Sequence, residues 1–101
     1  MIPTSFKMGG TTWRVRLCKM KNAYGETDFE KSTIRIASYL DGRETTDDIR
    51  IRTFIHEWFH AFQYTVGIET TEELAVLFEN MAYQSIKTAK GGAITWANIV
   101  G

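Results

Sequence analysis

The only two histidines of the chain lie four positions apart, in the string His56-Glu57-Trp58-Phe59-His60. Four residues advance an α-helix by about 400°, so both imidazoles project from one face, a turn apart. Two imidazoles at this spacing can bind one zinc ion, and the glutamate after the first can take a proton from a water on that metal. The string therefore predicts a hydrolytic zinc site, with His56 and His60 as ligands and Glu57 as the catalytic base.

A catalytic zinc site usually holds three protein ligands, so the chain must supply one more. There is no further histidine, and no aspartate follows Asp48. The single cysteine, Cys18, fits a small buried residue of a strand better than a ligand. The candidates that are left are the downstream glutamates Glu69, Glu72, Glu73 and Glu79.

A helix predicted to begin at Thr70 or Thr71 decides among these glutamates. Thr70 and Glu73 have the spacing of a capping box, and Glu73 borders the stripe of apolar residues that we expect to be buried. We therefore expect Glu73 to be the third ligand, with Glu79 and Glu72 as alternatives. The expected stripe consists of Leu74, Leu77, Phe78, Met81, Ala82 and Ile86.

The two histidines lie within another predicted helix. Apolar residues recur at steps of three and four from Ile51 to Val66. Thr45 or Thr46 can cap the start of this helix, and Gly67 can end it. This first helix positions the zinc site, and the second helix must supply the third ligand.

Two segments before the helices alternate apolar and polar residues with the period of a half-buried strand. They run from Thr11 to Met20 and from Phe29 to Leu40, and the turn at Tyr24-Gly25 makes them candidates for neighbours in a hairpin. We therefore predict an α+β domain over residues 1–101, with a small antiparallel or mixed sheet of two to four strands packed on the two helices. The expected buried side of the first strand comprises Trp13, Val15 and Leu17.

The composition is that of one globular domain, with 44% apolar and 24% charged residues among 101. Twelve basic residues balance twelve acidic ones, which disfavours nucleic acid as a partner, although residues 1–21 hold five cations and no acid. The longest uncharged stretch of the apolar middle, residues 58–68, is too short to span a bilayer, and the N-terminus does not resemble a signal peptide. We expect a cytoplasmic protein that does not act at a membrane.

The C-terminal residues allow two readings. The glycine pair at 91–92 should end the second helix. The residues after it, with Ile94 and Trp96, form either a short packed tail or an extra strand.

Most of the chain, about residues 24–86, resembles the small zinc peptidases of the gluzincin type, of the ImmA/IrrE-like and phage-encoded minimal kind. Their pattern is a strand with alternating isoleucines, a Thr-x-x-His-Glu-x-x-His-Ala helix, and a second helix that opens with Glu-Glu and carries a later Tyr-Gln. The resemblance implies that His56, His60 and Glu73 bind zinc and that Glu57 is the base. The matching segments here are residues 32–37, Thr53–Ala61, Glu72-Glu73 and Tyr83-Gln84.

The chain departs from that family at two places. Longer gluzincins have an aspartate four residues after the glutamate ligand, which orients a histidine, and this chain has Leu77 there. Larger members also have a separate domain that supplies an oxyanion donor, and Tyr64 and Tyr83 are the candidates for that role here.

The function implied is that of a zinc-dependent peptidase, in the first instance an endopeptidase, acting on a peptide or protein substrate. An extended substrate could pair with an edge strand near residues 33–38. The alternative is a catalytically silent zinc-binding module for protein interaction, stabilised by its metal. Glu57 separates the two readings, because a purely structural site has no need of an unliganded carboxylate beside the metal.

Overall fold

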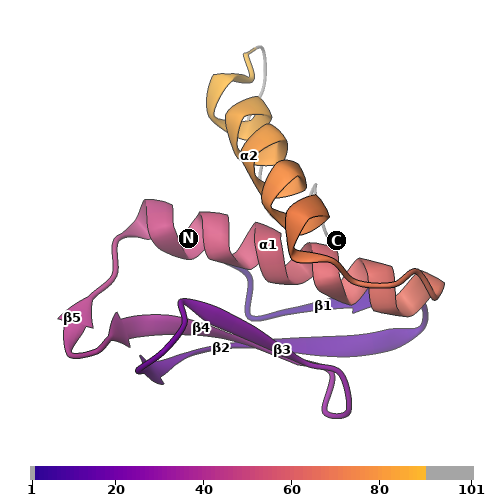
Figure 1. The fold of residues 1–101 in the computed structure, drawn as a ribbon, viewed down its shortest axis with the longest axis horizontal. Coiled ribbons are helices and arrows are strands. Elements are labelled where there is room, and N and C mark those ends of the chain that lie inside the picture. Colours follow the sequence, from indigo (N-terminus) through magenta and orange to yellow (C-terminus); the bar gives the residue numbers. More distant parts are fainter. Residues whose placement is uncertain (1, 91–101) are drawn as a thin grey trace.

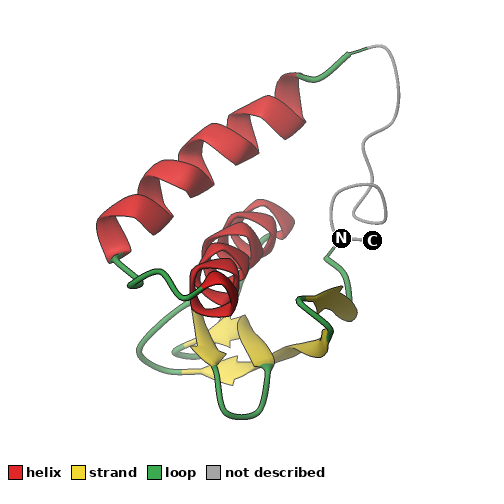
Figure 2. Ribbon diagram, turned by 90° about the vertical axis from the view of Figure 1, so that its right-hand side faces the viewer, coloured by secondary structure: helices red, strands yellow, loops and turns green. Residues whose placement is uncertain are grey.

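A computed structural model of the protein, which describes residues 2–90, has three layers: a β-sheet, a helix across one face of it, and a second helix packed on the first (Figures 1 and 2). The predicted tail, with Ile94 and Trp96, and the glycine pair at 91–92 lie outside the described residues. The elements are β1 (Ser5–Met8), β2 (Thr11–Met20), β3 (Gly25–Asp28), β4 (Thr33–Leu40), β5 (Arg43–Glu44), α1 (Asp47–Val66) and α2 (Glu72–Thr88).

The sheet is mixed, with strands in the order β1-β2-β4-β3 and with β5 paired to the end of β4. It confirms the predicted α+β class and a mixed sheet, but within residues 2–90 it has five strands and not two to four. The expected hairpin is wrong: β2 and β4 are neighbours but run parallel, with Val15 beside Ile34. The segment between them forms β3, which pairs with the other side of β4. Residues 33–38 therefore lie inside the sheet, and β3 is the edge strand among those that the structure describes.

The core lies between the sheet and α1. Leu17, which we expected in this core, is instead 48% exposed. The core rings of Phe6 and Trp13 stack on one another, and Phe54 of α1 meets Phe6 edge to face. The buried core cluster comprises Phe6, Trp13, Val15, Ile34, Ile36, Phe54 and Ala61.

Both predicted ends of α1 are confirmed. The Thr46 side chain accepts a hydrogen bond from the Ile49 N–H at 3.2 Å, which satisfies a free donor of the first turn. Gly67 ends the helix with a left-handed φ of 79°, and its N–H donates to carbonyls of the last turn. No helix within residues 2–90 combines the length and the apolar character needed to cross a membrane.

The start of α2 and its buried face differ from the prediction. Thr71 caps the helix by accepting from the Leu74 N–H at 3.3 Å, so the capping box of Thr70 and Glu73 is wrong by one residue. The packed side carries Ala75, which is fully buried, and Phe78, whose ring stacks on Phe59 of α1. Among the described elements, α2 packs mainly on α1, so part of the predicted stripe is left exposed. Its exposed members are Leu74, Leu77 and Met81.

Candidate functional site

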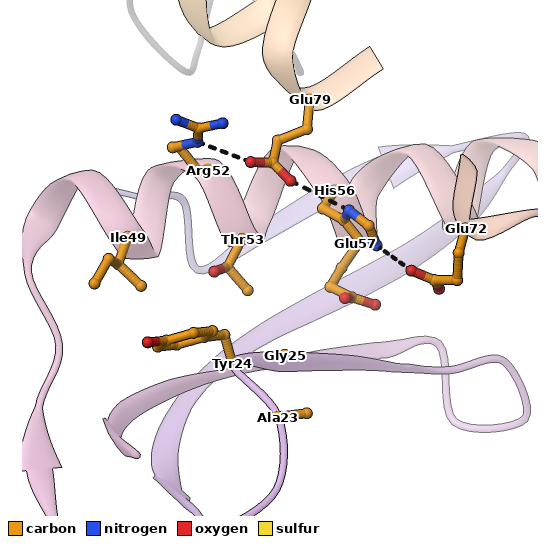
Figure 3. A pocket seen from close by; sticks show the side chains of 10 residues that line it. All are labelled: Ala23, Tyr24, Gly25, Ile49, Arg52, Thr53, His56, Glu57, Glu72 and Glu79. Carbon is orange, nitrogen blue, oxygen red and sulfur yellow. Dashed lines mark hydrogen bonds and ion pairs between the residues drawn. The ribbon is translucent and has the colours of Figure 1, made fainter. Parts of the chain in front are cut away.

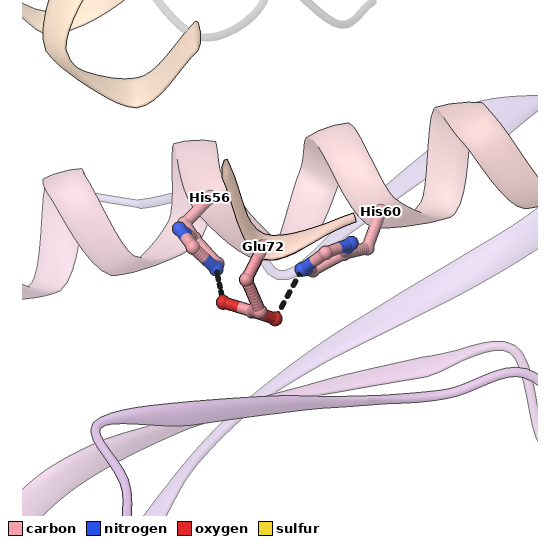
Figure 4. A group of neighbouring side chains, drawn as sticks. All are labelled: His56, His60 and Glu72. Carbon is pink, nitrogen blue, oxygen red and sulfur yellow. Dashed lines mark hydrogen bonds and ion pairs between the residues drawn. The ribbon is translucent and has the colours of Figure 1, made fainter. Parts of the chain in front are cut away.

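Two imidazoles of α1 converge on one carboxylate of α2 (Figure 4). The Nε2 atom of His56 lies 3.0 Å from Oε2 of Glu72, and the Nε2 atom of His60 lies 2.9 Å from Oε1 of the same residue. The ligand atoms of the three residues all lie within 4.8 Å of one another. Two imidazole nitrogens and a carboxylate that face one point can coordinate a single metal ion.

Glu72 reaches this position because it is the first residue of α2, directly after the Thr71 cap. Burial alone would raise its pKa, but the charge of His56 and the hydrogen bond from His60 outweigh that effect and lower the pKa. The Glu72 side chain stays 77% exposed. The group is therefore a charged carboxylate against two imidazoles, open to solvent on one side.

Glu79, one of the alternative ligands, lies behind His56 and not in the group. Its Oε1 atom is 3.3 Å from Nδ1 of His56, and its Oε2 atom accepts from Nε of Arg52 at 2.8 Å. Arg52 also donates to the side-chain oxygen of Asn80. Glu79 therefore contacts the imidazole nitrogen that faces away from Glu72, and the arginine fixes the carboxylate in turn.

Glu57 lies beside the histidines and points toward the sheet. Its residue is only 8% exposed, and the Thr27 hydroxyl of β3 donates to its Oε1 atom at 2.7 Å. Burial raises the pKa of Glu57, and the hydrogen bond from Thr27 and the charges of His56 and His60 offset part of that rise. A carboxyl with a raised pKa is suited to take and return a proton near neutral pH.

Gly25 allows β3 to approach α1 closely enough for this contact. A Cβ atom at Gly25 would lie 2.5 Å from Cγ2 of Thr53 and 3.1 Å from Cγ of Glu57. With any larger residue here, β3 or the side chain of Thr53 would have to shift. Thr27, two positions further along the same strand, then reaches Glu57.

A pocket of about 500 Å³ opens along this junction of α1, α2 and β3 (Figure 3). His56, Glu57, Glu72 and Glu79 all line it. Its remaining walls come from the start of β3 and the first half of α1. These wall residues include Tyr24, Ile49, Arg52 and Thr53.

The predicted third ligand, Glu73, is exposed and is not a member of the group that His56, His60 and Glu72 form. It lies about 200° around α2 from the buried Ala75. The residue before Glu73, which the sequence ranked lower, is the one that faces the histidines. The rotation of α2 accounts for this difference, because Glu72 lies on the same side as the buried Ala75.

The two predicted oxyanion stabilisers are engaged elsewhere. Tyr64 stacks on Phe29 with ring centroids 4.6 Å apart. The ring of Tyr83 lies under the Arg52 guanidinium at 5.0 Å, and its hydroxyl is hydrogen-bonded to Asp48, which raises the pKa of the phenol. Of the tyrosines within residues 2–90, Tyr24 is the one that lines the pocket.

Sequence reasoning missed Thr27, Arg52 and Tyr24 as neighbours of the site. Arg52 could have been found, since it precedes His56 by one helical turn and so shares its face. Thr27 and Tyr24 carry no such signal, because only the sheet topology brings them to the helix.

Comparison of the chain with models of known protein families, with curated proteins and with solved structures finds no match. The resemblance to small gluzincins stays a prediction that depends on the motifs of the sequence.

Proposed function

We propose that the protein is a zinc-dependent peptidase in which His56, His60 and Glu72 bind the metal. The observation that supports this most is the convergence of both Nε2 atoms on the Glu72 carboxylate. Two histidines and one glutamate are a known donor set of catalytic zinc, in which a fourth position stays open. In this proposal the third ligand is Glu72, and not Glu73 as we expected from the sequence.

When bound, zinc polarises a substrate carbonyl and lowers the pKa of a water toward about 7. Glu57 accepts the proton of the attacking water and afterwards gives it to the leaving amine. Its raised pKa brings the two protonation states closer in energy at neutral pH. Thr27 keeps the carboxyl turned to the site by its hydrogen bond.

The substrate in this proposal is an extended peptide at the β3 edge of the sheet. β3 has β4 on one side, and its backbone lies beside Glu57 and the pocket. An extended peptide can add to such an edge through main-chain hydrogen bonds, which supply affinity with little side-chain selectivity. The pocket beside Tyr24, Ile49 and Thr53 would receive one substrate side chain.

Metal content and cleavage together test the proposal. We expect one zinc per chain in the wild type, loss of zinc in Glu72→Ala, and retention in the matched variant Glu73→Ala. Glu57→Gln should keep zinc and lose cleavage of an unfolded protein such as reduced casein by about a hundredfold or more.

Three results would contradict the proposal. Zinc lost in Glu73→Ala but kept in Glu72→Ala would return the third ligand to Glu73. Zinc bound without cleavage would favour the silent interaction module. Failure of the wild type to bind zinc after reconstitution would exclude the metal site itself.

A further inference from the structure

On the side that faces away from β4, β2 is paired with another strand along only about half of its length. β1 pairs with β2 from Thr11 to Arg14, and the last contact on this side is the hydrogen bond from the Val15 N–H to the Thr4 carbonyl at 2.9 Å. Within residues 2–90, no strand pairs with this side of β2 beyond Val15. Residues 16–20 of β2 thus form an open edge.

The backbone groups of this open edge point outward at alternate residues. The Arg14 N–H donates to Ser32 and the Met20 carbonyl accepts from Asp41, so even-numbered residues bond toward β4. The irregularity near Cys18 does not disturb this alternation, because the extra residue, Ser38, belongs to β4.

By the same alternation, the odd-numbered residues Leu17 and Lys19 turn their N–H and C=O groups away from β4, as Val15 does. These groups have no strand partner among the described residues. They are donors and acceptors that another extended chain can use.

A hollow of about 520 Å³ lies next to this edge, between the N-terminal segment, β2 and α1. Its apolar lining includes Ile2, Pro3, Ile51 and Leu17, and the Leu17 residue is 48% exposed. Asp47 and Arg50, at the start of α1, also line the hollow. Side chains alternate along a strand, so a strand added beside β2 would place every second side chain in this hollow. Because much of this lining is apolar, we expect the partner to carry apolar residues at alternate positions.

The charge at the edge indicates what the other positions carry. Arg14 and Arg16, which lie on the opposite face of β2 from Leu17, are both exposed, and residues 1–21 contain no acid. A second copy of β2 would set cations against cations, which destabilises a strand pair. An acidic segment has the complementary charge.

We propose that residues 16–20 of β2 bind an extended acidic segment of a partner protein as an added strand, with alternate apolar side chains in the hollow beside Leu17. The edge lies on the opposite side of the sheet from β3, so this binding does not depend on the proposed zinc site. The proposal gives the protein a docking surface separate from its pocket.

The test uses the whole chain, freed of metal by a chelator, and a blocked heptapeptide of alternating glutamate and valine. We expect the amide NMR signals of Leu17 and Lys19 to shift and their hydrogen exchange to slow on titration. A peptide of alternating lysine and valine should bind about tenfold more weakly or worse, since charge complementarity is lost.

Variants locate the binding. Leu17→Asp and Arg16→Glu should each weaken binding about tenfold. Lys31→Glu, the same charge change at the turn between β3 and β4, should leave the affinity unchanged. Circular dichroism checks that each variant is folded, and these substitutions are at exposed positions.

Several outcomes would overturn the proposal. Signal shifts confined to β3, or equal affinity in all variants, would place binding elsewhere. Absence of binding would mean that the cations only protect the edge from aggregation. Binding that appears only in a chain shortened at residue 90 would make the C-terminal residues of this chain the occupant of the edge.

Discussion

The Thr27 hydroxyl donates to Oε1 of Glu57 across 2.7 Å, joining the edge strand of the sheet to the side chain proposed as the base. The same hydroxyl lies 3.3 Å from the Glu57 carbonyl. A carboxyl removed from water has few ways to lower the cost of its charge, and this bond is one of them. The strand that would hold a substrate thus also sets the ionisation of the base.

Thr27→Val removes this bond at almost constant volume. Burial raises the pKa of Glu57 and the hydrogen bond from Thr27 lowers it, so loss of this hydrogen bond should raise the pKa further. The base must be ionised to accept a proton, and the acid limb of kcat/KM should therefore move to higher pH. We expect a stability loss of about 1 kcal/mol besides.

Thr33→Val is the matched control, because its hydroxyl donates only to the exposed carbonyl of Lys31. It should leave the pH profile of cleavage unchanged. An acid limb that does not move in Thr27→Val would show that Glu57 is not the group that titrates there.

Glu57 should also make the metal-free protein less stable as the pH rises. Its pKa is raised in the folded state, so the native chain binds more protons than the unfolded chain between the two pKa values, and stability falls with pH across that interval. Below the unfolded pKa of about 4.3 the cost disappears. Each pKa unit between the two states corresponds to about 1.4 kcal/mol.

Glu57→Gln removes the charge and keeps an oxygen for Thr27 to donate to. Urea unfolding in a chelator should show the variant more stable than the wild type at pH 7 and equal to it near pH 4. Glu73→Gln, at an exposed position, should show no such difference at either pH. A variant that is less stable at pH 7 would mean that the Glu57 charge is compensated in the fold.

The sequence predicted α1 almost to the residue, and it predicted α2 without its orientation. For α1 the caps, Thr46 and Gly67, are local features and are visible in the chain. For α2 the apolar residues form a broad band, and packing against a single helix uses only one side of it. The side of α2 that packs on α1 carries Ala75 and Phe78, whereas Leu77 is exposed. This orientation of the helix places Glu72 at the histidines.

The sheet shows a similar division. The period of two located β2 and β4, because each alternates over eight or more residues. It could not show that the two are parallel neighbours, since that pairing depends on contacts between segments some twenty residues apart. β3, with the sequence Gly-Glu-Thr-Asp, has no apolar alternation at all, and with it the sequence missed Thr27.

Glu79 is expected to position His56 without binding the metal. Glu79→Gln weakens the acceptor behind Nδ1 of His56 and leaves Arg52 without its ion pair. Zinc affinity should fall about 10- to 100-fold, as measured by competition with a chromogenic chelator. Glu73→Gln makes the same charge change away from the histidines and should leave the affinity unaltered.

The opposite result would revise the ligand set. If Glu79→Gln abolished zinc binding while Glu72→Ala kept it, Glu79 would be the third ligand, as one of the sequence alternatives holds. Equal affinity in Glu79→Gln and the wild type would leave His56 without a positioning partner in α2.

Gly25→Ala tests the close approach of β3 to α1. The added Cβ would lie 2.5 Å from Cγ2 of Thr53, so β3, α1 or the Thr53 side chain must shift. Overpacking of this kind costs about 1–3 kcal/mol, and we expect a loss of that size in the free energy of unfolding.

Thr53→Ser removes the very methyl group that the new Cβ would meet, so it should restore most of the stability lost in Gly25→Ala. Alone, Thr53→Ser should have a small effect, and the double-mutant cycle should give a coupling of about 1 kcal/mol or more. Rescue would be incomplete, because Cγ of Glu57 and the Arg35 carbonyl lie 3.1 Å and 3.2 Å from the same Cβ. Additive effects would mean that the strand adjusts freely at Gly25, and that the Thr27 contact with Glu57 does not depend on this glycine.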